Sequence, residues 1–149
     1  MLKQQLKDEL KQSMLARDSE KTSTLRMLIS SVGYLEIDKG GAGYEATDED
    51  VMQVIQKEAK QRRDSIEQFT AGGRPELAEK EQKELDLLAV YLPAQMSEEE
   101  ITTIVDEAIT TTGATSPQDM GKVMGYLSPQ TKGKADGSLV SKIVREKLQ

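Results

Sequence analysis

The sequence contains no cysteine, no histidine and no tryptophan, and these absences exclude much of enzyme chemistry. A chain without cysteine has no disulfide, no thiolate nucleophile and no thiolate ligand for zinc. A chain without histidine has no imidazole to bind a metal or to act as a general base near neutral pH. We therefore expect no metal, no cofactor and no self-contained set of catalytic residues.

Long apolar runs and aromatic residues are also scarce. No run approaches the roughly 18 apolar residues that a membrane-spanning helix needs, so we expect a cytoplasmic protein with no membrane partner. Aromatic residues make up 3% of the chain, too few and too scattered for a platform that stacks unpaired bases. Folded RNA, which proteins contact through its shape and backbone, is the better candidate among nucleic acids, and we do not expect DNA.

The net charge of −6 argues against a protein that coats nucleic acid without selection, because such binding needs an excess of lysine and arginine. The charge is unevenly distributed, however. Residues 97–119 carry six acidic side chains and no basic one, whereas residues 120–149 carry six basic side chains and two acidic ones. This local excess of +4 in an otherwise acidic chain indicates a directed site for an anion.

Apolar residues recur with the 3.6-residue period of amphipathic helices along the whole chain, and no segment alternates as a strand does. The pattern predicts an all-α protein with seven helices. Their expected extents are 2–17, 20–38, from the Thr47 cap to Gly72, from Pro75 to about Leu92, and three more that start at Ser97, at Ser116 and near Asp136. The predicted inward stripe of the first helix is Leu2, Leu6, Leu10 and Met14.

The sequence also predicts two modules that meet near Pro93. Proline disfavours the continuation of a helix, and Ser97 with Glu100 forms a capping box that starts the next one. Residues 1–94 are expected to form an N-terminal bundle of four helices, and residues 97–149 a C-terminal module of three helices.

Four ionisable side chains are predicted to point inward in the N-terminal bundle. At 100° per residue, Glu58 and Arg62 fall on the apolar face of the third helix. The same arithmetic places Glu81 and Glu84 on the apolar face of the fourth. Charged groups that face a core must pair, so we expect Arg62 to bridge carboxylates. This polar layer either fixes how the helices pack or lines a cleft for a ligand or a divalent cation; we favour the structural role.

The basic residues of the C-terminal module are candidates for contact with phosphate. The predicted RNA-binding residues are Lys122, Lys132, Gly133, Lys134, Lys142 and Arg145. Lys132 and Lys134 flank a glycine in a loop that leads into a helix N-terminus, where backbone N–H groups favour anions. The alternative interpretation is an ordinary, solvated basic surface.

Several motifs resemble those of the YqeY family in order and spacing. They are Leu25-Arg26-Met27-Leu28, residues 57–65, Tyr91-Leu92-Pro93 and residues 113–125. The resemblance covers essentially the whole chain. Residues 132–136 and 139–146 are also similar to the tail domain of GatB, the B subunit of the glutamine-dependent amidotransferase that converts mischarged tRNA.

The resemblance implies an accessory protein that binds tRNA or a tRNA-processing complex through its C-terminal module. The family also carries the label of a carbon-nitrogen ligase with glutamine as amido donor. A second interpretation is therefore a participant in such a reaction, together with amidotransferase subunits, although the kinase-like cradle of GatB and the Ser-Ser-Lys machinery of the amidase do not carry over to this sequence. A protein-binding adaptor without an RNA role is the third.

Overall fold

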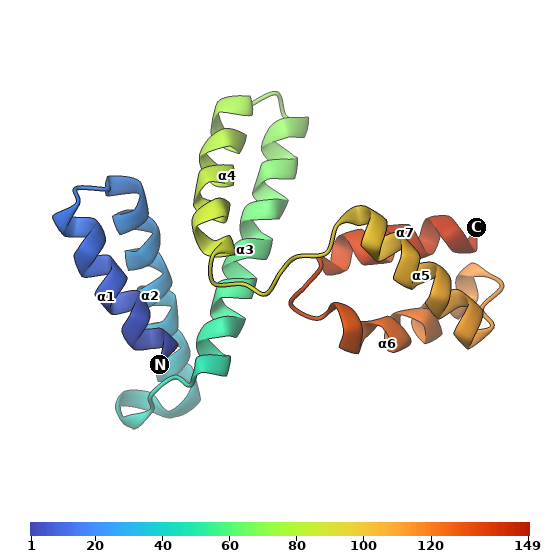
Figure 1. Ribbon diagram of the computed structural model, residues 1–149, viewed down its shortest axis with the longest axis horizontal. Helices are drawn as coiled ribbons and strands as arrows, with labels where there is room; N and C mark the ends of the chain where they lie inside the picture. Colours follow the sequence, from blue (N-terminus) through green and yellow to red (C-terminus); the bar gives the residue numbers. More distant parts are fainter. The chain divides into compact units, whose positions relative to one another are not determined.

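The computed structural model describes residues 1–149 and contains seven α-helices, two short 3₁₀ turns and no strand. The helices in Figure 1 are α1 (Leu2–Leu15), α2 (Ser19–Gly40), α3 (Asp48–Ala71), α4 (Pro75–Ala89), α5 (Glu98–Thr112), α6 (Met120–Thr131) and α7 (Gly137–Leu148). The 3₁₀ turns are η1 (Gly41–Gly43) and η2 (Pro117–Asp119). The prediction of an all-α protein with seven helices is confirmed.

The N-terminal unit, Met1–Leu92, contains α1 to α4 as two antiparallel hairpins, α1–α2 and α3–α4 (Figure 1). All four helices contribute to one apolar core, because each presents one apolar stripe to the others. The largest fully buried side chains of this core are Leu6, Leu28, Ile55, Leu88, Val32 and Val51.

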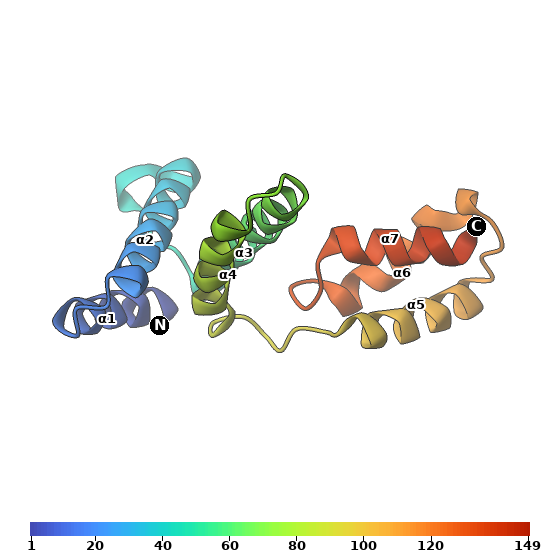
Figure 2. The ribbon, with the colours of Figure 1, turned by 90° about the horizontal axis from the view of Figure 1, so that it is seen from above.

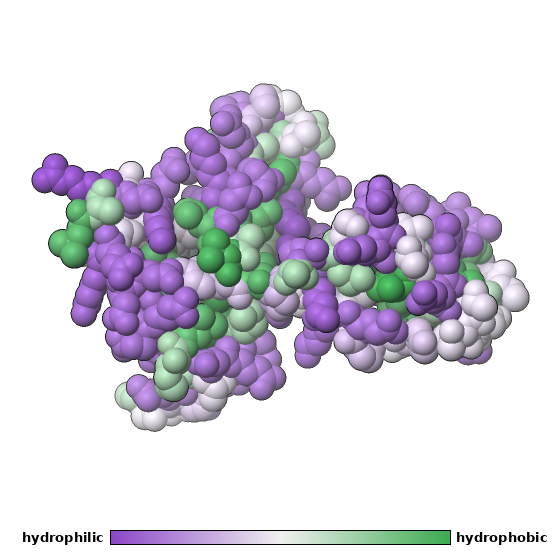
Figure 3. Space-filling model, in the orientation of Figure 1, coloured by the Kyte–Doolittle hydropathy of each residue, from purple (hydrophilic) through white to green (hydrophobic).

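The C-terminal unit, Pro93–Gln149, contains α5, α6 and α7, which all contact one another (Figure 2). It has a separate apolar core, whose largest fully buried side chains are Ile101, Val105, Val123, Leu127, Val140 and Val144. On the face shown in Figure 3, hydrophilic residues cover most of the surface of each unit, and hydrophobic residues form smaller areas among them.

Two helices begin at the capping boxes that the sequence indicates. The Thr47 hydroxyl accepts a hydrogen bond from the Asp50 N–H at 3.2 Å, and the Asp50 carboxylate accepts one from the Thr47 N–H at 3.1 Å. Ser97 and Glu100 form the same reciprocal pair at the start of α5, with distances of 3.1 and 2.9 Å. Each box satisfies two backbone donors that the first helical turn would otherwise leave unpaired.

The first helix differs from its prediction near its end. Met14 was expected on the inward stripe, but its side chain is 49% exposed, whereas the neighbouring Ser13 is 4% exposed. The Ser13 hydroxyl donates to the Leu10 carbonyl oxygen at 2.8 Å and lies 2.8 Å from the Thr22 hydroxyl of α2. The turn into α2 therefore covers Ser13 and leaves Met14 outside the core.

The start of α6 also differs from its prediction. Residues Pro117–Asp119, expected as the first helical turn, form the 3₁₀ turn η2, and the α-helix begins at Met120. The Asp119 carboxylate accepts a hydrogen bond from the Thr115 N–H at 3.0 Å, and this contact draws the preceding backbone into a tighter turn.

Asp50 holds the connection between α2 and α3. Its side chain is 4% exposed, and its carboxylate accepts hydrogen bonds from the Lys39 ammonium of α2, the Tyr44 hydroxyl (2.6 Å) and the Thr47 N–H (3.1 Å). These partners hold the pKa of Asp50 far below its usual range, and the hydrogen bond from Lys39 has the largest effect. Folding therefore favours the charged form of Asp50. The hydrogen bonds of this carboxylate hold the glycine-containing connection against α2 and α3.

The Asp50 contacts predict an acid-dependent stability. A carboxyl group whose pKa is lowered by folding contributes stability above its unfolded pKa of about 4, and this contribution is lost as the pH falls below that value. We expect Asp50→Asn to unfold at a lower urea concentration at pH 7 and to show a flatter loss of stability between about pH 5 and pH 2. The control is Glu45→Gln, an exposed carboxylate in the same connection. An Asp50→Asn profile parallel to that of the wild type would contradict the assignment.

The two separate cores lead us to propose that the units fold independently. A fragment of residues 93–149 is expected to show helical circular dichroism and a cooperative thermal transition, because it retains its whole core and the α5 capping box. A fragment that is unfolded at 10 °C would show that the C-terminal unit needs the N-terminal one.

Candidate nucleic-acid interface

Arg62 of α3 is the centre of the polar layer in the N-terminal unit and is 5% exposed. Its Nη1 donates to Glu58 Oε2 at 2.7 Å, and its Nε lies 3.3 Å from Glu84 Oε2 of α4 in an ion pair without hydrogen-bond geometry. The Ser31 hydroxyl of α2 donates to the other oxygen of Glu58 at 3.0 Å. Glu81, the fourth predicted member, is half-buried one turn from Glu84 on the same helix. The layer therefore links α2, α3 and α4.

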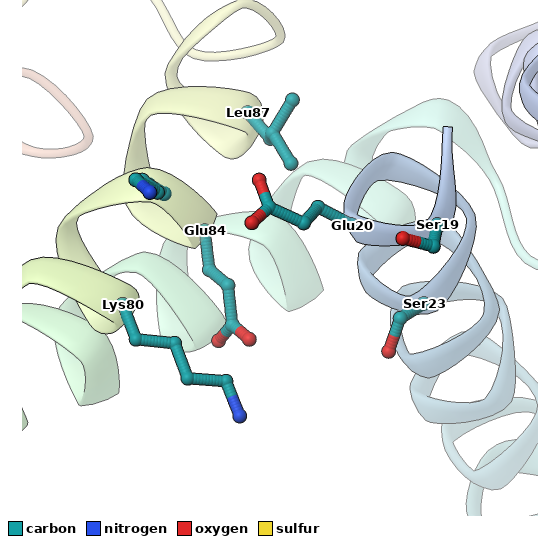
Figure 4. Close-up of a pocket in the computed structure, with 7 residues that line it drawn as sticks. Ser19, Glu20, Ser23, Lys80, Glu84 and Leu87 are labelled. Atoms are coloured by element: carbon teal, nitrogen blue, oxygen red, sulfur yellow. The ribbon is translucent and has the colours of Figure 1, made fainter. Parts of the chain in front are cut away.

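A cavity of about 190 Å³ lies beside this layer, between α2 and α4 (Figure 4). Its lining residues are Ser19, Glu20, Ser23, Lys80, Lys83, Glu84 and Leu87. The carboxylates of Glu20 and Glu84 and the ammonium of Lys80 point into the space between the two helices (Figure 4). Two acidic and two basic side chains leave the cavity without net charge, and Glu84 is already engaged by Arg62. The structural role of the polar layer remains our prediction.

The structural role predicts a large effect of one substitution. Arg62→Ala leaves Glu58 and Glu84 without their cation and should lower the free energy of unfolding by about 3 kcal/mol, measured by urea denaturation. The matched control is Lys60→Ala on the same helix, whose 3.7 Å pair with Asp64 is nearly half exposed and should contribute less than about 1 kcal/mol. If the two variants unfold at the same urea concentration, the polar layer is solvated and does not hold the helices.

Five basic residues of the C-terminal unit, the cationic set, lie on or between its last two helices. They are Lys122 on α6, Lys132 and Lys134 in the turn after it, and Lys142 and Arg145 on α7. All five are exposed and none forms an ion pair within the chain. Lys147, the remaining cation of α7, differs from the set because its ammonium lies 3.3 Å from Asp106 of α5.

The surroundings of the five cations differ in detail. Lys142 and Arg145 are three residues apart, so they are neighbours on one face of α7, opposite the buried Val140 and Val144. Lys122 interacts electrostatically with Asp119. The pKa of Asp119 is held below its usual range, first by the Thr115 N–H and to a lesser degree by the Lys122 ammonium.

Backbone hydrogen bonds close the turn between α6 and α7. The Lys132 N–H donates to the Ser128 carbonyl oxygen, and the N–H groups of Lys134 and Ala135 both donate to that of Thr131. Gly133 has a φ of 77°, a conformation that glycine adopts without strain. The turn therefore uses these N–H groups internally, so that a phosphate would be held here by lysine side chains and not by these backbone donors.

The N-terminus of α7 is likewise occupied. The Asp136 carboxylate accepts a hydrogen bond from the Ser138 N–H at 3.1 Å and places a negative charge at this helix end. The sequence pattern suggested that the positive end of this helix would attract phosphate. In the structure an aspartate takes that place, and its negative charge makes this helix end less favourable for an anion.

Sequence reasoning missed the contact that anchors the turn. The Gln95 side chain donates to the Gly133 carbonyl oxygen at 3.0 Å, and the Met96 N–H donates to the Lys134 carbonyl oxygen at 2.8 Å. These partners are 38 residues apart, and a single sequence carries no local signal for such a pairing. The segment that precedes α5 thus fixes the turn that bears Lys132 and Lys134.

Fold and site together define an all-helical protein of two units, with exposed, unpaired cations on the second. The chain belongs to the YqeY family, described as Yqey-like protein, which matches residues 3–148.

Relatives named "Altered inheritance of mitochondria protein 41, mitochondrial" occur in several yeasts. The protein of Lachancea thermotolerans is 30% identical over 149 residues, which cover 95% of this chain and 78% of that protein. That of Vanderwaltozyma polyspora is 36% identical over 68% of this chain and 55% of its own length. That of Eremothecium gossypii is 36% identical over 60% of this chain and 48% of its own length. The matched part thus spans about half of the last two relatives.

The expectation of a cytoplasmic location is contradicted by these relatives, whose names place them in mitochondria. The expectation rested on the lack of long apolar runs, which separates membrane-spanning chains from others but does not separate one aqueous compartment from another. No helix of the structure is long and apolar enough to cross a bilayer.

Proposed function

We propose that this protein is a helical accessory protein whose C-terminal unit contacts the phosphate backbone of folded RNA, with tRNA as the expected partner. The observation that carries the proposal is the cationic set: five exposed cations without an ion pair inside the chain. Each such cation that meets a phosphate releases condensed counterions from the RNA, and this release drives binding.

The placement of the acidic residues supports the same proposal. Glu98, Glu99 and Glu100 occupy the first turn of α5, where the helix dipole stabilises negative charge. The C-terminal unit therefore carries an acidic cluster at the start of α5, and none of the five cations of the cationic set forms an ion pair with it. Such a separation of charge gives an anionic partner one preferred side of the unit.

Folded RNA fits these cations better than a flexible polyanion does. Lys132 and Lys134 project from a turn held by hydrogen bonds, while Lys142 and Arg145 project from a helix. A backbone that is already held matches phosphates that are themselves fixed by RNA folding, because little backbone entropy is then lost on contact. The similarity of residues 132–136 and 139–146 to the tail domain of GatB supports tRNA among folded RNAs.

The proposal predicts salt-dependent binding that weakens when two lysines are removed. With about three to five phosphate contacts, the logarithm of the association constant should fall against the logarithm of salt concentration with a slope of roughly −2 to −4. Lys132→Gln with Lys134→Gln should flatten this slope by about 2 and weaken binding to different tRNAs by similar factors, because phosphate contacts do not read sequence. Fluorescence anisotropy with labelled tRNA measures both quantities.

A control with the same change of charge separates a local from a general effect. Lys60→Gln with Lys147→Gln removes two cations that already have acidic partners, Asp64 and Asp106. This variant should retain most of the wild-type slope. Equal losses in both double variants would show that only net charge matters, and the absence of any tRNA binding by the wild type at low salt would reject the proposed function.

A further inference from the structure

The C-terminal unit contains a groove of about 440 Å³ between α5 and the end of α6. Its lining residues are Met96, Glu100, Thr103, Ile104, Gln130 and Lys134. This volume falls within the range of about 300–1,000 Å³ that is typical of sites for small ligands. Lys134 belongs both to the groove and to the cationic set, so that the groove adjoins the candidate phosphate contacts.

The exposed surface of the groove is mainly apolar, and polar residues line it as well. Met96 and Ile104 are half-buried and pack against the core of the unit, which makes them a supported apolar wall. Glu100 uses its Oε2 to accept the Ser97 N–H, and Oε1 has no such role in the capping box. Gln130 contributes an amide group. An apolar wall in the same groove as a carboxylate, an amide and an ammonium suits a flat ligand that has polar groups and a phosphate.

Hydrogen bonds hold the walls in place. The Met96 N–H donates to the Lys134 carbonyl oxygen at 2.8 Å, which fixes the two ends of the groove relative to each other. The capping box fixes Glu100 at the start of α5. A groove that exists before binding requires little ordering when a ligand enters, and a larger share of the contact energy then appears as affinity.

We propose that this groove binds one unstacked nucleotide of the RNA, a step that rests on the proposed function. Its base lies against Met96 and Ile104, and its phosphate meets the ammonium of Lys134. Methionine offers a polarisable, adaptable surface to the face of a ring. The Glu100 carboxylate accepts a hydrogen bond from an amino group of the base, as glutamate does from cytosine. Proteins commonly bind bases that project from loops, bulges and ends of RNA in this way.

The test compares two RNA hairpins that differ only in one unpaired, bulged nucleotide. The wild-type, full-length chain should bind the bulged hairpin at least about fivefold more tightly than the paired one, because the unpaired base leaves water for the apolar surface of Met96 and Ile104. Thr103→Glu places a carboxylate in the groove and should abolish this preference. Equal affinity of the wild type for the two hairpins would overturn the proposal.

Thr110→Glu is a closely matched control. Thr103 and Thr110 are seven residues apart on the same face of α5, both are exposed, and each donates to the carbonyl oxygen four residues before it, at 3.0 Å. Only Thr103 lines the groove. Thr110→Glu should retain the preference for the bulged hairpin. The proposal fails if both variants keep the preference or if both lose it.

A second measurement separates the failure of this site from the failure of the proposed function. If the wild type binds neither hairpin, the RNA function is rejected, and the groove itself is tested with adenosine monophosphate alone. Shifts of the Met96 and Ile104 methyl signals in nuclear magnetic resonance spectra, absent in Thr103→Glu and present in Thr110→Glu, would support a nucleotide site. No shift at millimolar nucleotide would overturn it, as would equal shifts in the two variants.

Discussion

The turn between α6 and α7 is the constraint on which the candidate chemistry of the C-terminal unit depends. Its N–H groups bond back to the last turn of α6, and its carbonyl oxygens at Gly133 and Lys134 receive hydrogen bonds from Gln95 and Met96. Because these five backbone groups are engaged, the turn is held in one shape, and they are not available to a partner. The direction of Lys132 and Lys134, and one wall of the groove, follow from that shape.

The N-terminal unit uses its charges in the opposite way. Arg62 is buried and joined to Glu58 and Glu84, and Asp50 is buried and joined to Lys39. Loss of one partner from such a pair lowers the stability of the fold, because the other charge stays buried without a partner. Such pairs also favour one arrangement of the packed helices over others. The N-terminal unit therefore uses buried ion pairs to hold its helices together, whereas the five cations of the cationic set in the C-terminal unit are exposed and form no ion pair.

Much of the fold follows from local sequence signals, because helical periodicity and capping residues act within a few positions. The angle of 100° per residue correctly placed Arg62 toward the core, because a residue's position along a helix determines the side to which its side chain points. It could not place Met14 and Ser13, whose burial depends on the path of the next turn, or the 3₁₀ turn before Met120. The anchoring of the α6–α7 turn by Gln95 was equally out of reach. Contacts between distant segments depend on tertiary packing, which no local period encodes.

The central claim is that RNA meets the C-terminal unit through side chains of α6, α7 and the turn between them. Backbone amide signals of the labelled full-length protein, followed during titration with tRNA at low salt, test it most directly. The account predicts shifts that concentrate on residues 120–149 and fade as salt is raised, because counterion release drives the contact. Shifts confined to the N-terminal unit or to the acidic first turn of α5, or no shifts at all, would contradict it.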